Sequence, residues 1–171
     1  MTSLSPNLFL EKFDANKHSN SIKTFNCGNK DCNNFIREAA AIYQKEDLGC
    51  TYVLLNEKQN VVAYVTVSMG ALKFRDPDLA LILNSEEKPN HLPALRIGRI
   101  GTILSEQNKG HGKTLIKIVI SLYEELRQKL GARCLIVDSV PEKVEWYKKL
   151  GFKPLFNDTT GRSTIPMYLR P

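Results

Sequence analysis

The residues with the clearest chemical potential form a glycine-containing turn, Gln107–Lys113. A helix is predicted directly after it, because apolar residues recur there at steps of three or four: Leu115, Val119, Leu122, Leu126 and Leu130. The first backbone N–H groups of a helix lack partners within it, and the helix dipole adds positive potential, so this end binds phosphate well. Gly110 and Gly112 would let a pyrophosphate approach closely, and Lys109 and Lys113 add positive charge. A purely structural turn is the alternative.

Two phosphate-binding motifs are excluded by spacing. Gln107 stands where a P-loop requires its first glycine, and Leu115 stands where the dinucleotide fingerprint requires its third. The pattern Gln-x-x-Gly-x-Gly, from Gln107 to Gly112, instead resembles the acyl-CoA pyrophosphate loop of the GNAT superfamily of N-acetyltransferases. Further along, Glu145–Phe152 resembles the aromatic-Tyr-x-x-x-Gly-Phe signature of the same superfamily. The two motifs stand in the order that the superfamily requires.

The resemblance implies acetyl transfer from acetyl-CoA to a primary amine, by direct attack in a ternary complex and without a metal. It implies that backbone N–H groups of the strand, at Ile100, Thr102 and Ile103, bind the pantetheine arm and polarise the thioester carbonyl. It assigns the pyrophosphate to residues of the turn, namely Gln107, Lys109, Gly110, Gly112 and Lys113.

The resemblance also implies that Tyr147 protonates the departing CoA thiolate. A tyrosine with a reference pKa of ~10, above a thiol's ~8.5, is protonated at pH 7 and can donate. General acids of this kind contribute typically ~10² to 10⁴ in rate. The alternative role for Tyr147 is that of an aromatic residue on the core face of a helix.

The attacking amine must lose a proton. An α-amine, with a reference pKa of ~7.7 to 8.0, is roughly a tenth neutral at pH 7 and needs no strong base, unlike a lysine at ~10.4. Glu106, His111 and His91 are possible bases, with an exposed charge as the alternative role of each. Tyr52 and Tyr64 could face a substrate cleft or pack in the core.

Two further segments are similar to one branch of the superfamily, the GNAT toxins of toxin-antitoxin modules. Phe25–Gly28, followed by Phe35-Ile36, resembles their Phe-x-Cys-Gly motif and the helix after it, and Ile97–Ile103 is similar to their Leu-Gly-Arg-Leu-Ala-Val-Asp strand. Ile103 replaces the aspartate of that strand, and Asn108 replaces a usual glycine of the loop. This branch implies the α-amine of aminoacyl-tRNA as acceptor, and a cognate antitoxin and a homodimer as further partners.

Two other functions stay open. A relative could acetylate peptides, proteins or small amines, or the chain could be a non-catalytic acyl-CoA or RNA-binding module. The net charge of +6 and pI of about 9.1 suit an anionic partner such as a CoA pyrophosphate or an RNA backbone, or simply a solvated surface.

Length and composition indicate the number of domains, the state of the cysteines and the location of the protein. A length of 171 residues predicts one domain, 1–171, and 42% hydrophobic with 25% charged residues is ordinary for a globular protein. The four cysteines lack zinc-site spacing and are expected to be free thiols. With no signal sequence and no apolar run near the ~18 residues of a membrane span, we expect a cytoplasmic protein without membrane contact.

The predicted fold is an α/β (α+β) mixed sheet of six to seven strands flanked by about four helices, which the resemblance identifies as the GNAT fold. The expected strands are 8–13, 51–56, 61–68, 95–104, 134–138, 152–156 and 164–169. Helices are expected after an N-cap at Asn29 or Asp31, from the turn to Gly131, and from Pro141 to Leu150-Gly151. A long loop is expected over 69–93, with a possible short helix at 79–83.

Overall fold

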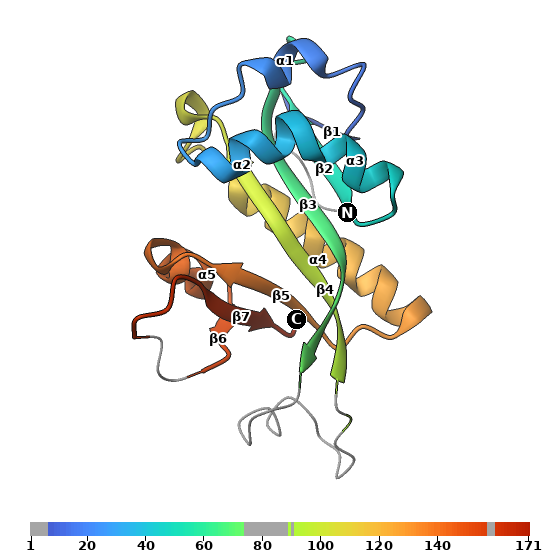
Figure 1. The fold of residues 1–171 in the computed structure, drawn as a ribbon, viewed down its shortest axis with the longest axis vertical. Coiled ribbons are helices and arrows are strands. Elements are labelled where there is room, and N and C mark those ends of the chain that lie inside the picture. The colour runs from blue at the N-terminus through green and yellow to red at the C-terminus, as the bar shows by residue number, and fades with distance from the viewer. Residues whose placement is uncertain (1–6, 74–88, 90, 157–159) are drawn as a thin grey trace. The chain divides into compact units, whose positions relative to one another are not determined.

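The computed structural model describes residues 7–73, 89, 91–156 and 160–171. They form two compact units, Met1–Ser68 with Gly98–Ser121, and Met69–Ile97 with Leu122–Pro171. The strands make one seven-stranded sheet in the order β1-β2-β3-β4-β5-β7-β6 (Figure 1). The mixed sheet of the predicted fold class is therefore confirmed, and the description of residues 1–171 as one domain stays a prediction.

The first unit has an antiparallel layer of strands. Its elements are β1 (Phe9–Lys12), α1 (Ser19–Lys23), α2 (Lys30–Asn34), α3 (Ala40–Lys45), β2 (Cys50–Leu55) and the first part of β3 (Val61–Lys73). β1 pairs with β2, and β2 pairs with β3 in the hairpin that the sequence predicted. The last part of β4 (His91–Thr102) and the start of α4 (His111–Leu130) complete this unit.

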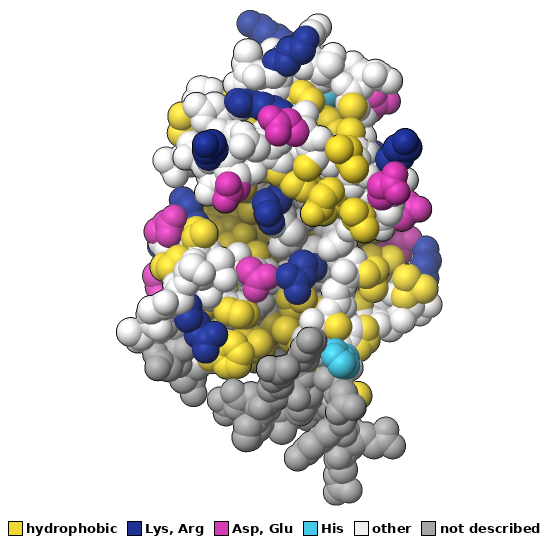
Figure 2. All heavy atoms as spheres, in the orientation of Figure 1, with side chains coloured by type: hydrophobic (Ala, Val, Ile, Leu, Met, Phe, Trp, Pro, Cys, Tyr) yellow, Lys and Arg dark blue, Asp and Glu magenta, His cyan; other side chains and the backbone are white. Residues whose placement is uncertain are grey.

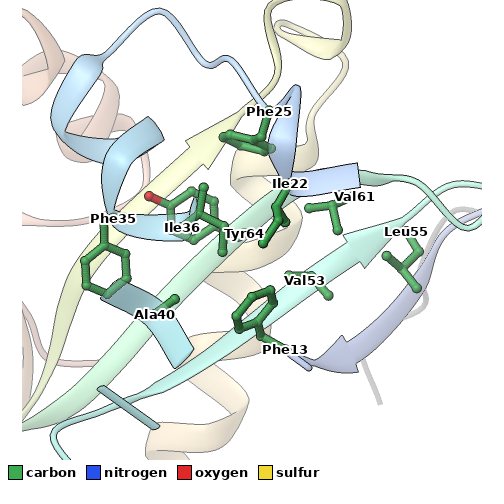
Figure 3. Close-up of a cluster of buried hydrophobic side chains, with 10 residues drawn as sticks. All are labelled: Phe13, Ile22, Phe25, Phe35, Ile36, Ala40, Val53, Leu55, Val61 and Tyr64. Carbon is green, nitrogen blue, oxygen red and sulfur yellow. The ribbon is translucent and has the colours of Figure 1, made fainter. Parts of the chain in front are cut away.

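A continuous helical segment covers the core of this unit. Asn29 is the N-cap, as one of the two sequence alternatives had it, because its side chain accepts a hydrogen bond from the Cys32 backbone N–H at 3.0 Å. Between α2 and α3, residues Phe35–Ala39 form a turn of π-helix, in which the Ala40 N–H bonds the Phe35 carbonyl. Figure 3 shows the buried cluster under this segment, which consists of Phe13, Ile22, Phe25, Phe35, Ile36, Ala40, Val53, Leu55, Val61 and Tyr64.

The second unit contains the parallel strand pair. β5 (Cys134–Ser139) runs parallel to β4, with partners from Ala94↔Cys134 to Ile97↔Val137. After β5 come a short 3-10 turn (Pro141–Lys143), α5 (Val144–Lys149), β6 (Lys153–Pro154) and β7 (Ile165–Leu169), which pairs antiparallel to both β5 and β6. The parallel return strand and the helix opened by Pro141 confirm the sequence predictions.

Several strand boundaries predicted from the sequence were wrong. β3 continues to Lys73 and β4 begins at His91, so residues 69–73 and 91–93 of the expected loop are strand, and Leu72 and Leu92 are buried in one core cluster of the second unit. Residues 74–88, including the helix expected at 79–83, lie outside the described residues. β4 ends at Thr102 and a 3-10 turn, Leu104–Glu106, follows it. β6 has two residues where five were expected.

In the described part of the chain, no helix has the length and apolar character to cross a membrane.

Candidate functional site

The turn between β4 and α4 has the backbone geometry of an anion-binding helix start. Gly110 adopts φ +88°, where a side chain would be strained, and its carbonyl accepts the first helical hydrogen bond from the Thr114 N–H at 3.0 Å. Gly110 is therefore the residue that caps α4, so the next three N–H groups, those of His111, Gly112 and Lys113, have no partner within the helix. A Cβ on Gly110 would meet nothing within 4 Å, so the glycine serves the backbone angle and not a close contact.

Charged side chains of this turn bind one another. The Glu106 carboxylate contacts the Lys109 ammonium at 2.9 Å and the His111 Nε2 at 3.0 Å. His111, 8% exposed, is buried, so the exposed charge suggested for it as an alternative role is wrong. Hydrogen bonds from His111 and then Lys109 hold the pKa of Glu106 below its usual range. An ionised carboxylate with two partners is a weak candidate for a general base.

The Gln107 side chain also bonds within the protein. Its amide nitrogen donates to the Cys27 carbonyl at 3.0 Å and to the Thr102 carbonyl at 3.2 Å. The Leu104 N–H adds a bond to the Asn26 carbonyl at 2.9 Å. Gln107 thus joins the Phe25–Gly28 motif to the end of β4, a positioning role that the loop motif alone did not reveal.

The backbone N–H groups of the three residues predicted to bind the pantetheine arm, Ile100, Thr102 and Ile103, do not all point to the same side of β4. The Ile103 N–H donates to the Val62 carbonyl at 2.9 Å, so it is already bonded to the β3 side. N–H groups alternate between the two sides of a strand, so those of Ile100 and Thr102 point away from β3. The β4 register with β5 ends at Ile97. The backbone N–H groups of Ile100 and Thr102 therefore point away from β3, beyond the end of the β5 register, whereas the Ile103 N–H is bonded to β3.

Close packing explains the glycine within this strand segment. A Cβ on Gly101 would lie 3.0 Å from Cε1 of Tyr64 and 3.3 Å from the Cys27 sulfur. Tyr64 is fully buried, and its hydroxyl donates to the Cys32 carbonyl at 2.8 Å. Of the two roles suggested for Tyr64, the structure shows core packing.

Tyr147 belongs to the second unit. It lies on α5, it is 5% exposed, and its ring packs edge-on against Trp146 and Phe152 at centroid distances of 4.8 and 5.3 Å. Gly151 follows at φ +92°, which turns the chain so that the Phe152 N–H reaches the Tyr147 carbonyl at 3.1 Å. The Tyr-x-x-x-Gly-Phe motif is therefore a helix end that fixes the tyrosine ring. His91, the third possible base, is the exposed first residue of β4.

A small hollow in the first unit was not foreseen. Its lining consists of Phe35, Tyr43, Leu48, Thr66, Ser68, Gly98 and Arg99. The Arg99 guanidinium lies 5.6 Å from the centre of the Phe35 ring, and Tyr43 packs edge-on against the same ring. The signal in the sequence was the aromatic pair at helical spacing, but only the fold brings Arg99 to it. Among the residues that the structure describes, no three His, Cys, Asp or Glu side chains gather as a metal site.

No protein-family model matches the chain. Solved structures do match it over nearly its whole length. A bacterial toxin superposes with a TM-score of 0.86 at 18% identity, covering 97% of this chain and 92% of its own. The toxin AtaT in complex with acetyl-methionyl-tRNAfMet superposes with a TM-score of 0.78 at 21% identity, covering 96% and 95%.

A tyrosine-to-phenylalanine mutant of AtaT, bound to the C-terminus of the antitoxin AtaR and to acetyl-CoA, superposes with a TM-score of 0.75 at 20% identity, covering 96% and 93%. These matches show that the chain has the fold of the GNAT toxins, which confirms the family resemblance at the level of the fold.

Proposed function

We propose that this protein is an acetyl-CoA-dependent N-acetyltransferase whose acceptor is the α-amine of an aminoacyl-tRNA. The observation that carries the proposal is the Gly110 turn, which leaves three N–H groups at the start of α4 beside a strand edge with further N–H groups. The toxin AtaT, which has the same fold, is bound to acetyl-CoA in one structure and complexed with acetyl-methionyl-tRNAfMet in another.

The turn fits a pyrophosphate through its backbone. The N–H groups of His111, Gly112 and Lys113 would bind phosphate oxygens, and the exposed Lys113 side chain adds a positive charge. Lys109 and Gln107 act by holding the turn in shape, because both side chains bond within the protein. Preorganised donors of this kind lose little freedom when the ligand binds.

The strand edge would serve the reacting end of the cosubstrate. N–H groups of Ile100 and Thr102 would bind the pantetheine arm and stabilise negative charge on the thioester oxygen as the amine attacks. A new C–N bond forms, the C–S bond breaks, and Tyr147 gives its phenolic proton to the departing thiolate. The amine loses its own proton to water, since an α-amine is roughly a tenth neutral at pH 7.

The proposal extends to the domain organisation, the cellular location and the protein partners. Residues 1–171 would act as one acetyltransferase domain, and an aminoacyl-tRNA acceptor places its activity in the cytoplasm. The AtaT structure bound to part of AtaR supports a cognate antitoxin as a partner, and a homodimer stays a prediction.

Replacing Tyr147 with Phe tests the chemistry. The expected result is a fall in kcat of roughly 10² to 10⁴, the usual contribution of a general acid, with the acetyl-CoA affinity unchanged. Tyr123→Phe is the matched control, because Tyr123 is also a buried tyrosine, and its hydroxyl donates to the Arg133 carbonyl at 2.9 Å. It should cost stability and leave kcat unchanged. A non-catalytic acyl-CoA-binding module would bind acetyl-CoA and show no turnover in any variant.

Salt distinguishes the acceptors. A tRNA held through its phosphates should lose affinity steeply as salt rises, with a slope of about 0.7 to 0.9 in log affinity per log salt for each phosphate contact. Equilibrium binding of a nonreactive aminoacyl-tRNA analogue, measured across a salt series, provides this slope. A flat series would contradict the tRNA acceptor and favour peptides or small amines.

A further inference from the structure

The hollow in the first unit lies between β4 and the helical segment that contains Phe35 and Tyr43. Its other lining residues are Leu48, Thr66, Ser68, Gly98 and Arg99. Arg99 directly precedes Ile100, whose backbone N–H the proposed function assigns to the pantetheine arm of acetyl-CoA. The hollow therefore borders the part of β4 where the acceptor amine would meet the thioester.

Arg99 gives this hollow a positive charge. The residue is exposed, its guanidinium lies 5.6 Å from the centre of the Phe35 ring, and its Nη1 donates to the Gly98 carbonyl at 2.7 Å. Among the described residues, none that lines the hollow is acidic. A guanidinium has five N–H donors in a planar fork that matches the oxygens of a phosphate, and the bond to Gly98 uses one of them. The other donors are suited to a phosphate group.

The size of the hollow indicates that it holds one group of a larger ligand. Its volume is about 50 Å³, whereas sites that enclose a whole small molecule measure about 300 to 1,000 Å³. The Ser68 hydroxyl and the Arg99 guanidinium are the polar groups that a phosphate would meet there. A phosphate in the hollow, with the rest of the ligand outside it, matches both the size and the chemistry.

Tyr43 provides an aromatic ring at the same place. It packs edge-on against Phe35, with the ring centroids 5.1 Å apart, and 40% of the residue is exposed. Proteins bind single-stranded RNA by stacking its bases on aromatic rings, while positively charged side chains hold its backbone. The 3′ end of a tRNA, which carries the amino acid, is single-stranded. An exposed ring beside an arginine therefore fits a nucleotide of that end.

We propose that Arg99 and Tyr43 form a subsite for the terminal nucleotide of the acceptor tRNA, in which the Arg99 guanidinium binds the phosphate and the Tyr43 ring stacks on the base. This inference rests on the proposed function and names the part of the acceptor that the subsite holds. The aminoacyl group is attached to the ribose of this nucleotide. Binding the nucleotide beside Ile100 therefore brings the α-amine towards the thioester carbonyl.

Two RNA probes test the subsite: total deacylated tRNA, and the same tRNA shortened by its terminal nucleotide. Their equilibrium binding to the full chain is measured across a salt series without acetyl-CoA. We expect the wild type to bind the full-length tRNA about 5- to 150-fold more tightly, the usual contribution of one stacked base. The salt slope should be steeper by about 0.7, the value for one phosphate contact on a single strand. Equal affinity of the wild type for both probes would overturn the proposal.

Variants assign the two contacts. Arg99→Gln should remove the difference in salt slope, and Arg99→Lys, which keeps the charge, should retain it. Tyr43→Leu should remove most of the preference for the full-length tRNA, whereas Tyr43→Phe, which keeps the ring, should retain it. Arg162→Gln is the matched control and should behave as the wild type, because the Arg162 guanidinium also lies over a ring, 4.7 Å from the centre of Phe156. A slope that Arg99→Gln leaves unchanged, or that Arg162→Gln lowers equally, would overturn the phosphate contact.

Acetyl-CoA also contains an adenine and phosphates, so its affinity is measured with the same variants. Unchanged acetyl-CoA affinity in Arg99→Gln and Tyr43→Leu supports a subsite for the acceptor, and a loss equal to that seen with tRNA would overturn it. A wild type that binds acetyl-CoA and neither tRNA would contradict the tRNA acceptor of the proposed function, and the subsite with it. Equal binding of both tRNAs would remove the subsite alone.

Discussion

At the scale of single residues, two side chains of the loop motif form bonds to other groups of the protein. Gln107 donates to the carbonyls of Cys27 and Thr102, and Lys109 pairs with Glu106. Exposed ion pairs are typically worth less than about 1 kcal/mol each, so their effect is to fix the shape of the turn more than to stabilise the fold. Ligand affinity is then expected to come chiefly from backbone N–H groups at the start of α4.

Gly110→Ala should show whether the Gly110 turn contributes to acetyl-CoA binding separately from its contribution to the stability of the fold. Ala at φ +88° costs roughly 1–2 kcal/mol of left-handed strain. Relief of that strain would change the direction of the backbone N–H groups at the start of α4. Gly131→Ala is a matched control at φ +72°, also with nothing within 4 Å of its Cβ, at the other end of α4. Urea unfolding should show similar stability losses, whereas acetyl-CoA titration should show a loss for Gly110→Ala alone. Equal affinities in both variants would contradict the backbone role.

Glu106→Gln should have a pH-dependent effect on stability. The pKa of Glu106 is lowered below 4.5 in the folded protein by His111 and Lys109, so its ionised form stabilises the fold. That contribution is full above 4.5 and is lost as the pH falls through the lowered pKa. Denaturant unfolding of wild type and variant should therefore differ by up to about 1 kcal/mol near neutral pH and converge in acid. A difference that does not shrink as the pH falls would contradict the ion-pair role.

At the scale of elements, the segment Gly98–Thr102 of β4 has one side toward β3 and one side beyond the end of the β5 register. Its β3 side is continued by the Ile103 hydrogen bond to Val62, and the β5 register stops at Ile97. Gly101 lets Tyr64 and Cys27 pack directly on the strand backbone. The strand is therefore held from β3 and from the helical segment.

Gly101→Ala tests this packing. The new Cβ would lie 3.0 Å from the buried Tyr64 ring, whose hydroxyl is fixed by Cys32, so the ring cannot move freely. Overpacking of this kind costs typically about 1–3 kcal/mol. Gly98→Ala on the same strand is the control, since its Cβ would meet only the Thr66 carbonyl, at an ordinary 3.7 Å. Thermal unfolding should show a clear loss for Gly101→Ala and little change for Gly98→Ala; the reverse order would contradict the packing.

Local patterns in the sequence predicted most elements because their signals are local. The Asn29 cap, the Gly131 and Gly151 helix ends and the β2–β3 hairpin each depend on residues close in the chain. The π-turn at Phe35–Ala39 was missed, since no residue type specifies it and packing of Phe35, Ile36 and Ala40 on the strands does. The extension of β3 past Ser68 was missed because Leu72 meets Leu92 only in the folded core.

At the scale of the whole molecule, the sheet order was predictable only through the family resemblance. Periodicity locates strands, whereas the sequence β1-β2-β3-β4-β5-β7-β6 depends on pairings between distant segments. The glycine turn and the helix that begins after it were predicted correctly from the motif, and ligand binding by this turn stays a prediction. The inward bonds of Gln107 and the Arg99–Phe35 contact could not be read from spacing, because their partners lie far away in the chain.

The basic side chains on one face of the molecule are mixed with acidic ones. On the face drawn in Figure 2, lysine and arginine side chains lie apart, with acidic side chains between them. The net charge of +6 therefore favours anionic partners in general and does not by itself identify an RNA. The acceptor must be identified by the chemistry it undergoes.

The most direct measurement is transfer of radiolabelled acetyl from acetyl-CoA to total aminoacyl-tRNA, with deacylated tRNA, a peptide mixture and polyamines in parallel. The proposed function predicts label in aminoacyl-tRNA alone, released with the amino acid by mild base, and lost in Tyr147→Phe. Label in peptides or polyamines instead would contradict the acceptor. Label in no acceptor, from a protein that binds acetyl-CoA, would contradict the enzyme itself.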